Sequence, residues 1–310
     1  MTKMSFYIYI LWIYTRVMQY AVMGVTGQVG GATARALLEE GQTFRAILRD
    51  RAAADVWKAR GADVAIADFH DAAAMKSACT GVDALFVMTP PCFTSPDPIA
   101  ENRAMVETLR TAIVGAGVPY VVFLSSIGAQ YTSGLGAIAT KHDLEQAIRA
   151  LDIPSVAIRA GWFMDNYRGQ IVSSEATGTL PSMLNPLDLR IPMIATEDIG
   201  RLAAALLRAE PNEKRVVEFA TAEYSSNDVA EALSSVLHRD VTASIVPRDQ
   251  RVDMYRSWGF TALAASLMSE MIDGFNSGWI AFEGTPAEQL YGTMTLEKAL
   301  ETLSCRYALN

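Results

Sequence analysis

Short apolar segments rich in β-branched residues alternate with longer amphipathic segments from residue 18 to residue 160. The apolar segments predict strands at 20–23, 44–48, 63–67, 84–88, 120–124 and 155–159. The segments between them predict helices at 31–40, 52–60, 71–79, 99–116 and 137–151. Strands without polar alternation are typical of a sheet that is covered on both faces. The repeated strand–helix order predicts right-handed crossovers and a doubly wound parallel sheet of the α/β class.

The regular alternation ends after residue 161. Residues 162–194 contain aromatic residues, methionines and prolines with little periodicity. An amphipathic helix is predicted at 197–208, and a further strand is predicted at 216–219. Residues 226–304 are predicted to be mostly helical, apart from 241–246.

A glycine-rich turn, Gly-Val-Thr-Gly-Gln-Val-Gly at 24–30, lies between the first predicted strand and the first predicted helix. Glycines let the backbone turn sharply and approach a pyrophosphate closely, and the N–H groups of the first helical turn attract phosphate. The spacing is G-x-x-G-x-x-G rather than G-x-G-x-x-G, and glycines alone also form plain turns. The flanking strand and helix favour nucleotide binding here. The residues of the turn expected at the cofactor are Gly24, Thr26, Gly27, Gln28, Val29 and Gly30.

The chain is therefore predicted to have a Rossmann fold. We expect an NAD(P)-binding domain over 18–160 and a smaller substrate-binding portion over 161–310, in which 195–222 return to the sheet. Ligands of such a sheet lie at the carboxyl ends of its strands. Residues 1–17 are an extension of uncertain status. Their apolar run, 6–14, is too short to span a bilayer, which needs about 20 residues, and no small-residue cleavage site follows it.

The composition narrows the possible partners. The chain has 310 residues, of which 51% are hydrophobic, enough for a sizeable core in one large or two unequal domains. A net charge of −8 without a long basic run gives no support for nucleic-acid binding. The three scattered thiols, Cys79, Cys92 and Cys305, fit a reduced compartment, so a cytoplasmic location is expected. Neither the thiols nor the three histidines have metal-ligand spacing, and neither a metal nor a membrane partner is predicted.

Four motifs, taken in order, resemble those of the atypical short-chain dehydrogenases and, within them, the NmrA-like family over residues 18–303. The glycine turn resembles the family fingerprint. Phe-Leu-Ser-Ser-Ile-Gly-Ala at 123–129 is similar to the fifth-strand signature, and Lys-His-Asp-Leu-Glu at 141–145 is similar to the K-x-x-x-E helix. Residues 158–166 resemble the R-P-G-x-F-x-x-N segment, with Ala160 in place of proline. The resemblance implies NAD(P) binding. Some members reduce quinones, dyes or other unsaturated compounds, and others are redox-sensing regulators without clear turnover.

The residue after the second predicted strand bears on the choice of cofactor. NAD enzymes usually place Asp or Glu there to hold the ribose 2′-hydroxyl. Here the position is occupied by Arg49, whose guanidinium suits a 2′-phosphate, with Arg51 and Lys58 nearby. NADP(H) is therefore the preferred cofactor. Asp50 leaves NAD(H) open, and Arg49 is alternatively a solvated loop residue.

Further cofactor contacts follow from the family resemblance and from the strand ends. Asp68 is expected to bond the adenine amino group, with Phe69 beside the ring, although Asp68 alternatively caps a turn. The backbone after the fourth strand is expected to pass the cofactor ribose, and proline fixes its path. The further residues expected at the cofactor are Met88, Thr89, Pro90, Ser125, Lys141, Gly161 and Phe163.

The expected proton-transfer residues are incomplete. Classical short-chain dehydrogenases carry Y-x-x-x-K, which places Tyr and Lys on one helical face. Lys141 is present, but Ala137 stands four residues before it. The catalytic candidates are Lys141, Ser125 at the end of the fifth strand, and Tyr131 in a Gly/Ser-rich loop. Packing is the alternative role for Tyr131, and a surface ion pair with Glu145 is the alternative for Lys141.

The missing tyrosine favours some reactions over others. Reduction of an ordinary ketone benefits from an acid placed near the carbonyl oxygen. A quinone needs such an acid less because it delocalises the negative charge that the hydride brings, and a cationic conjugated acceptor needs it less because the hydride neutralises its positive charge. We therefore expect an NADPH-dependent oxidoreductase that transfers hydride to a quinone-like or other conjugated small molecule. The substrate wall is expected from Phe163, Asn166, Tyr167 and Trp258, with Phe260 near them.

Other functions and assemblies remain open at this point. The main alternative is a non-catalytic NADP(H)-sensing regulator that binds a partner protein. An isomerase, epimerase or lyase is a third hypothesis. The helices after the fourth and fifth strands are candidates for pairing two subunits as a homodimer.

Overall fold

The computed structural model describes residues 18–209 and 212–307, so the expected extension 1–17 lies outside the described residues. An eight-stranded sheet has the order β13-β10-β6-β5-β4-β1-β2-β3, and every neighbouring pair of strands is parallel. The prediction of a doubly wound parallel sheet is confirmed. Its strands are β1 (Tyr20–Met23), β2 (Phe44–Leu48), β3 (Asp63–Ile66), β4 (Ala84–Val87), β5 (Val121–Ser126), β6 (Ser155–Ala160), β10 (Lys214–Ala220) and β13 (Glu288–Tyr291).

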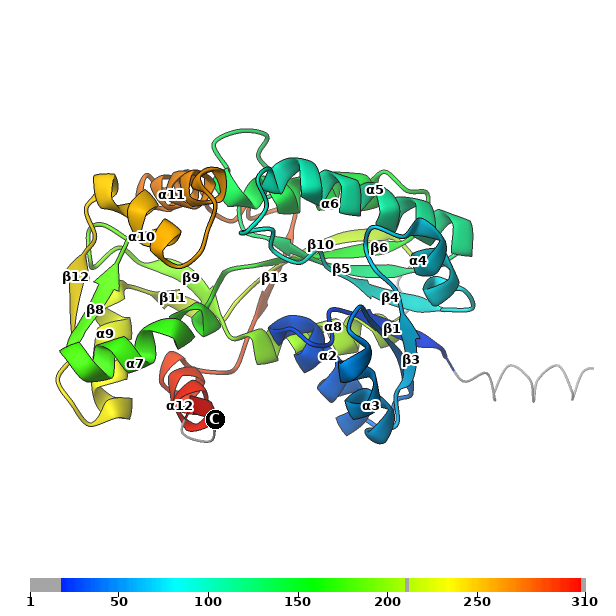
Figure 1. Cartoon of the computed structure of the whole chain (residues 1–310), viewed down its shortest axis with the longest axis horizontal. Coiled ribbons are helices and arrows are strands. Elements are labelled where there is room, and N and C mark those ends of the chain that lie inside the picture. The colour runs from blue at the N-terminus through cyan, green and yellow to red at the C-terminus, as the bar shows by residue number, and fades with distance from the viewer. Residues whose placement is uncertain (1–17, 210–211, 308–310) are drawn as a thin grey trace, which may run out of the picture.

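Helices cover both faces of this sheet. Figure 1 shows α4, α5 and α6 above the sheet and α2, α3 and α8 below it. These helices are α2 (Gln28–Glu39), α3 (Arg51–Ala59), α4 (Ala72–Cys79), α5 (Pro98–Ala116), α6 (Ala139–Arg149) and α8 (Thr196–Arg208). Because both faces are covered, the central strands β1 and β4 are buried at every position, as their continuous apolar sequences predict.

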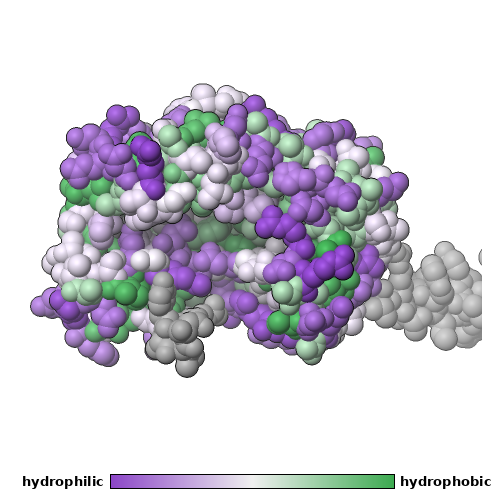
Figure 2. Space-filling model, in the orientation of Figure 1, coloured by the Kyte–Doolittle hydropathy of each residue, from purple (hydrophilic) through white to green (hydrophobic). Residues whose placement is uncertain are grey.

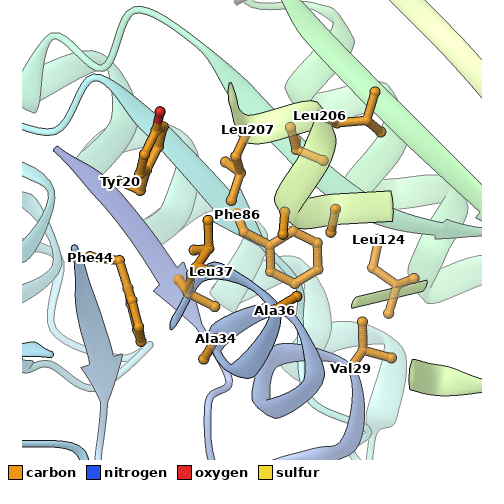
Figure 3. Close-up of a cluster of buried hydrophobic side chains, with 14 of the residues drawn as sticks. Tyr20, Val29, Ala34, Ala36, Leu37, Phe44, Phe86, Leu124, Leu206 and Leu207 are labelled. Atoms are coloured by element: carbon orange, nitrogen blue, oxygen red, sulfur yellow. The ribbon is translucent and has the colours of Figure 1, made fainter. Parts of the chain in front are cut away.

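The core below the sheet joins the first and last helices of that layer. Phe86 of β4 is fully buried among Leu37 of α2 and Leu207 of α8 (Figure 3). A Cβ at Gly200 of α8 would overlap Ala32, so glycine permits the close approach of the two helices. Burial of each such large apolar side chain contributes roughly 1.5–3 kcal/mol.

The remaining elements form a second body beside the carboxyl ends of the strands, on the left in Figure 1. It contains a three-stranded sheet, β11-β9-β7, and a parallel pair, β12-β8. Its strands are β7 (Trp162–Phe163), β8 (Thr179–Ser182), β9 (Ile191–Ile194), β11 (Ala222–Tyr224) and β12 (Thr242–Ile245). Its helices are α7 (Arg168–Thr177), α9 (Ser226–Leu237), α10 (Arg251–Ser257), α11 (Ala262–Asn276) and α12 (Leu296–Tyr307).

Residues 226–304 are mostly helical with a strand inside 241–246, as expected. The structure adds one strand that was not expected, because β13 forms the edge of the large sheet beside β10. The strand reads Glu-Gln-Leu-Tyr and lacks an apolar run, so local propensity does not indicate it. Long-range contacts described below hold it in place. Within the part of the chain that the structure describes, no helix has the length and apolarity needed to cross a bilayer.

Candidate active site

A cavity of about 700 Å³ lies where the carboxyl ends of the central strands meet the second body. Figure 2 shows the molecule hollowed between its two halves on this face, with hydrophobic residues at the floor of the hollow. The position agrees with the rule that ligands of doubly wound sheets bind at the carboxyl ends of the strands.

The structure brings many, but not all, of the sequence-predicted residues to this cavity. Those that line it are Gly27, Gln28, Val29, Met88, Thr89, Ser125, Lys141, Gly161, Phe163, Asn166, Tyr167 and Trp258. Those outside its wall are Gly24, Thr26, Gly30, Arg49, Asp68, Phe69, Pro90 and Tyr131.

The glycine turn has a different steric requirement at each glycine. Gly24 follows β1 with a φ of +69°, in the left-handed region that favours glycine. A Cβ at Gly30 would overlap the carbonyl oxygens of Met23 and Gly24, so Gly30 permits α2 to pack closely against the end of β1. Gly27 is the N-cap of α2 and offers no side chain to the N–H groups of the first turn.

The uncapped start of α2 fits a dinucleotide pyrophosphate. The carboxylates of Asp50, Asp71 and Asp97 accept backbone N–H groups at the starts of α3, α4 and α5. A carboxylate at the equivalent position of α2 would repel phosphate. Glycine instead leaves the first-turn N–H groups and the positive end of the helix dipole facing the cavity.

Arg49 and Asp68 are not among the residues that line the cavity. Arg49 is largely exposed, with its Nε 4.0 Å from Oδ2 of Asp68. Asp68 also accepts a hydrogen bond from the His70 backbone N–H at 2.9 Å, so it caps a turn, as the alternative interpretation proposed. Asp50 accepts from the Ala52 N–H at 2.8 Å, which directs its carboxylate to α3. Phe69 packs, partly buried, against the core on the α4–α5 side of the sheet.

Lys141 joins α6 to the segment after β4. Its Nζ donates to the carbonyl oxygen of Thr89 at 3.0 Å and to Oγ1 of the same residue at 3.2 Å. Burial lowers the pKa of Lys141 to about 8. Its alternative pairing with Glu145 is not formed, because Glu145 turns away from the cavity into the protein interior and binds Arg159.

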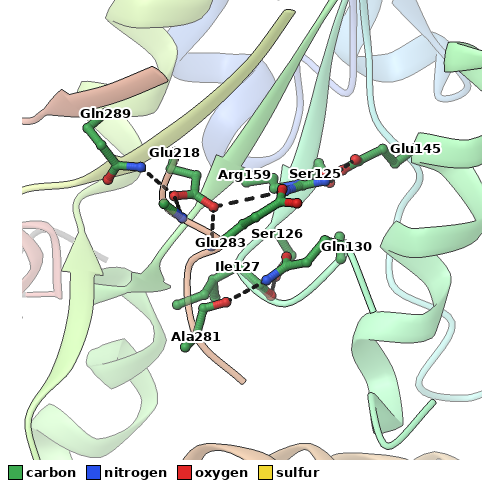
Figure 4. Close-up of polar contacts among 12 residues, drawn as sticks. Ser125, Ser126, Ile127, Gln130, Glu145, Arg159, Glu218, Ala281, Glu283 and Gln289 are labelled. Carbon is green, nitrogen blue, oxygen red and sulfur yellow. Dashed lines mark hydrogen bonds and ion pairs between the residues drawn. The ribbon is translucent and has the colours of Figure 1, made fainter. Parts of the chain in front are cut away.

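Ser125 lines the cavity, but its hydroxyl hydrogen already has an acceptor. The hydroxyl donates to Oε2 of Glu145 at 2.6 Å, and Arg159 donates to both oxygens of the same carboxylate (Figure 4). Burial raises the pKa of Glu145, but the hydrogen bonds and charge of Arg159 outweigh it and hold that pKa below its usual value. Ser125 therefore presents its oxygen to the cavity as an acceptor rather than as a proton donor.

The buried ion pair extends into the last strand of the sheet. Arg159 donates to Glu283 at 2.6 Å and lies 3.9 Å from Glu218. Glu218 accepts from the backbone N–H groups of Glu283 and Gly284 and from the side-chain amide of Gln289 in β13 (Figure 4). The sequence contains a signal for this cluster, since Arg159 is the only charge in β6 and Glu218 lies within the apolar part of β10.

Tyr131 does not reach the cavity. Its ring stacks on Trp279, with 4.5 Å between the ring centroids, and the Trp279 indole donates to the Ser133 carbonyl oxygen. The contacts of Tyr131 are those of the packing alternative. The expected catalytic role has no geometric support at this position.

Sequence reasoning missed a second group of lining residues. Phe93 stacks on Phe260 with 4.3 Å between ring centroids, and the Thr261 N–H donates to the Phe93 carbonyl oxygen. These contacts join the segment after β4 to the segment before α11 across the cavity. The other missed lining residues include Cys92, Met183, Leu184, Tyr255, Met268, Met271 and Phe275. They are ordinary apolar or aromatic positions that carry no local signal.

The fold and the cavity define a class of protein: a Rossmann-fold protein with a dinucleotide-type turn beside a large apolar cavity. The chain belongs to the NmrA-like family, whose sequence model matches residues 18–277. The resemblance inferred from the motifs is therefore confirmed.

Two relatives and one solved structure illustrate the likeness. An NAD(P)H azoreductase from Xenophilus azovorans is 26% identical, over 81% of this chain and 85% of that protein. Quinone oxidoreductase 2 from Escherichia coli (strain K12) is 24% identical, over 91% of this chain and 98% of that protein. A solved structure of an NADPH-dependent quinone oxidoreductase from Escherichia coli, complexed with NADPH, has a TM-score of 0.75 at 22% identity. The superposition covers 93% of this chain and 99% of the chain in that structure.

Proposed function

We propose that this chain is an NADPH-dependent oxidoreductase that transfers hydride to a quinone-like or other conjugated small molecule. The observation that carries the proposal is one continuous cavity at the carboxyl ends of the strands. It joins the glycine turn and Lys141 at one end to aromatic and apolar side chains at the other. The names of the azoreductase and the quinone oxidoreductase support the same class of reaction.

The residues present fit the cofactor. The N–H groups at the start of α2 would hold the pyrophosphate, and Arg49 would hold the 2′-phosphate that distinguishes NADPH. Lys141, fixed by two bonds to Thr89, would donate to the nicotinamide ribose hydroxyls. When bound, NADPH supplies the hydride equivalent.

The protein's own contribution is mainly orientation and exclusion of water. Ala137 lines the cavity at the position where the classical enzymes carry tyrosine, and it has no hydroxyl to offer. A quinone needs a placed acid less than a ketone does, because its developing charge is delocalised. Holding a flat acceptor between apolar walls therefore contributes most of the rate enhancement.

The test is to titrate the purified protein with NADPH and NADH, following nicotinamide fluorescence, and then to add menadione. We expect tight NADPH binding followed by rapid oxidation. Binding without oxidation of NADPH by a panel of quinones and dyes would favour the alternative, a non-catalytic NADP(H) sensor. Binding of neither cofactor would contradict both functions.

A variant makes the test specific for the cofactor phosphate. Arg49→Ala should weaken NADPH binding about 10-fold or more, since a charge-assisted bond contributes about 1.5–3 kcal/mol, and should leave NADH binding almost unchanged. Lys58→Ala is the matched control and should leave NADPH binding almost unchanged, because the Lys58 ammonium lies 3.8 Å from Asp55 within α3.

A homodimer and a cytoplasmic location stay predictions.

A further inference from the structure

Two tyrosine hydroxyls at the substrate end of the cavity have no hydrogen-bond partner among residues 18–209 and 212–307. Tyr167 and Tyr255 both line the cavity and are only 9% and 4% exposed. Tyr120 provides the contrast, since its buried hydroxyl donates to the Leu206 carbonyl oxygen at 3.0 Å. A nearly buried hydroxyl normally has such a partner, because leaving it unpaired is costly.

Both tyrosines line the cavity, and we infer that their hydroxyls face it. Neither oxygen is among the enclosed, unpartnered polar atoms of the described residues. Each oxygen therefore keeps some accessible surface on a side chain that is otherwise buried at the cavity wall. Burial raises the pKa of both phenols well above the ordinary value, so both hydroxyls keep their hydrogen near neutral pH.

The two hydroxyls reach the cavity from separate parts of the fold. Tyr167 ends the 3₁₀ turn Met164–Tyr167 that follows β7, in the same segment as Gly161 and Phe163. Tyr255 lies on α10, near Trp258, with which it makes an edge-to-face contact at 5.5 Å. Most of the surrounding lining is apolar. Two fixed donors in an apolar cavity are the arrangement that orients a ligand with a flat apolar body and separate polar atoms.

We propose that Tyr167 and Tyr255 donate hydrogen bonds to oxygen atoms of the acceptor, so that this site selects quinones over conjugated molecules without oxygen. The proposal rests on the proposed function and specifies its substrate class. A para-quinone carries two carbonyl oxygens on opposite sides of its ring, which suits donors that approach from different segments. Tyr167 is the hydroxyl that takes over the donor role left open by Ala137.

The reduction balances with the cofactor as reductant. One quinone, one NADPH and one proton from solvent give one hydroquinone and one NADP⁺. The hydride carries two electrons to the quinone, and negative charge develops on a quinone oxygen before the solvent proton arrives. A hydrogen bond from Tyr167 strengthens as that charge develops, so it stabilises the transition state more than the bound quinone.

The decisive experiment compares two ligands of nearly the same shape on the NADP⁺-loaded protein, where no reduction occurs. Menadione and 2-methylnaphthalene share the same methylated bicyclic body, and only menadione carries the two carbonyl oxygens. We expect Tyr167→Phe and Tyr255→Phe each to weaken menadione binding about 3- to 10-fold, the range for one neutral hydrogen bond. Affinity for 2-methylnaphthalene should stay within 2-fold. Isothermal titration calorimetry measures both.

A matched tyrosine variant and a kinetic readout complete the test. Tyr120→Phe removes a hydroxyl that does not line the cavity and bonds Leu206 instead, so it should preserve both affinities. With NADPH present, Tyr167→Phe should lower kcat for menadione more than it raises KM, because its bond strengthens in the transition state.

Two outcomes overturn the proposal: equal weakening for both ligands, which would indicate packing, or no weakening for either. A wild-type protein that binds menadione in the expected tyrosine-dependent way but never oxidises NADPH would contradict the proposed function while leaving the binding roles intact.

Discussion

The two ends of the cavity are built in different ways. At the cofactor end, backbone geometry dominates: three glycines within 24–30 set a turn, an open helix start and a close helix–strand contact. At the substrate end, side chains dominate, and they come from segments as distant as Phe93, Tyr167 and Phe275. Backbone recognition leaves a local pattern in the sequence, whereas side-chain recognition depends on which distant segments the fold brings together.

Arg159 binds Glu145 behind the cavity-lining residue Ser125, and loss of Arg159 should have the largest effect on stability. Arg159→Leu leaves Glu145 and Glu218 buried without their shared cation, so we expect the free energy of unfolding to fall by about 3–5 kcal/mol. Urea unfolding measures the loss.

The control for Arg159 is Arg149→Leu, which removes an exposed partner 3.3 Å from the same Glu145 and should change stability by less than about 1 kcal/mol. Similar losses of stability in the two variants would show that the buried ion pair stabilises the fold no more than the exposed one.

The pH dependence of the free energy of unfolding has a definite sign. Because the pKa of Glu145 is lowered on folding, its contribution is present above the unfolded value of 4.5 and is lost as pH falls through the folded pKa.

The cofactor end should be intolerant of a single methyl group. Gly30→Ala places a Cβ onto the carbonyl oxygens of Met23 and Gly24, so α2 must move away from β1. We expect about 1–3 kcal/mol of destabilisation and a loss of NADPH affinity larger than that of any substrate-end variant. Thermal unfolding and fluorescence titration measure the two effects. Gly169→Ala is the control, since a Cβ there meets no atom within 4 Å; equal effects in both variants would refute the steric argument.

Deprotonation of Lys141 should have the smallest effect of these changes on NADPH affinity and on stability. Below pH 8 its ammonium is charged and can donate to the cofactor, so the Kd for NADPH should rise as pH increases above about 8. Without cofactor, the unfolded state binds more protons between pH 8 and 10.5, so the free energy of unfolding should increase with pH over that window. Lys141→Met should flatten both profiles. A Kd for the wild-type protein that stays constant from pH 7 to 9 would exclude Lys141 from cofactor binding.

Much of the Rossmann portion could be predicted from local sequence. The strands at 20–23 and 44–48 occur where the apolar runs placed them, and α4 lies within the predicted 71–79, with Asp71 as its N-cap. Most of the predicted helices begin or end a residue or two away, because fraying and capping decide those ends. β13 could not be predicted, since its position depends on contacts with Glu218 rather than on its own propensity.

The site was predictable to the extent that its residues follow strand ends. The positions after β1, β4 and β6 reach the cavity because the carboxyl ends of parallel strands share one edge of the sheet. Tyr131 was proposed from proximity in sequence alone, and the loop carries it instead to Trp279. Tyr255 and Phe93 were missed, because an aromatic residue on a helix or loop has the same local signature whether it packs or faces a ligand.

The Glu218 contacts also bear on how the chain is synthesised. Glu218 leaves the ribosome well before the N–H groups of Glu283 and Gly284 that its carboxylate accepts. Until those residues have been synthesised, the Glu218 carboxylate lacks their hydrogen-bond donors. Burying the carboxylate in the sheet without these donors is costly, so the sheet is not completed before β13 is made. Translation that stops before β13 therefore yields a product with an open sheet edge and a buried carboxylate that lacks three of its hydrogen-bond donors, two features that favour its degradation.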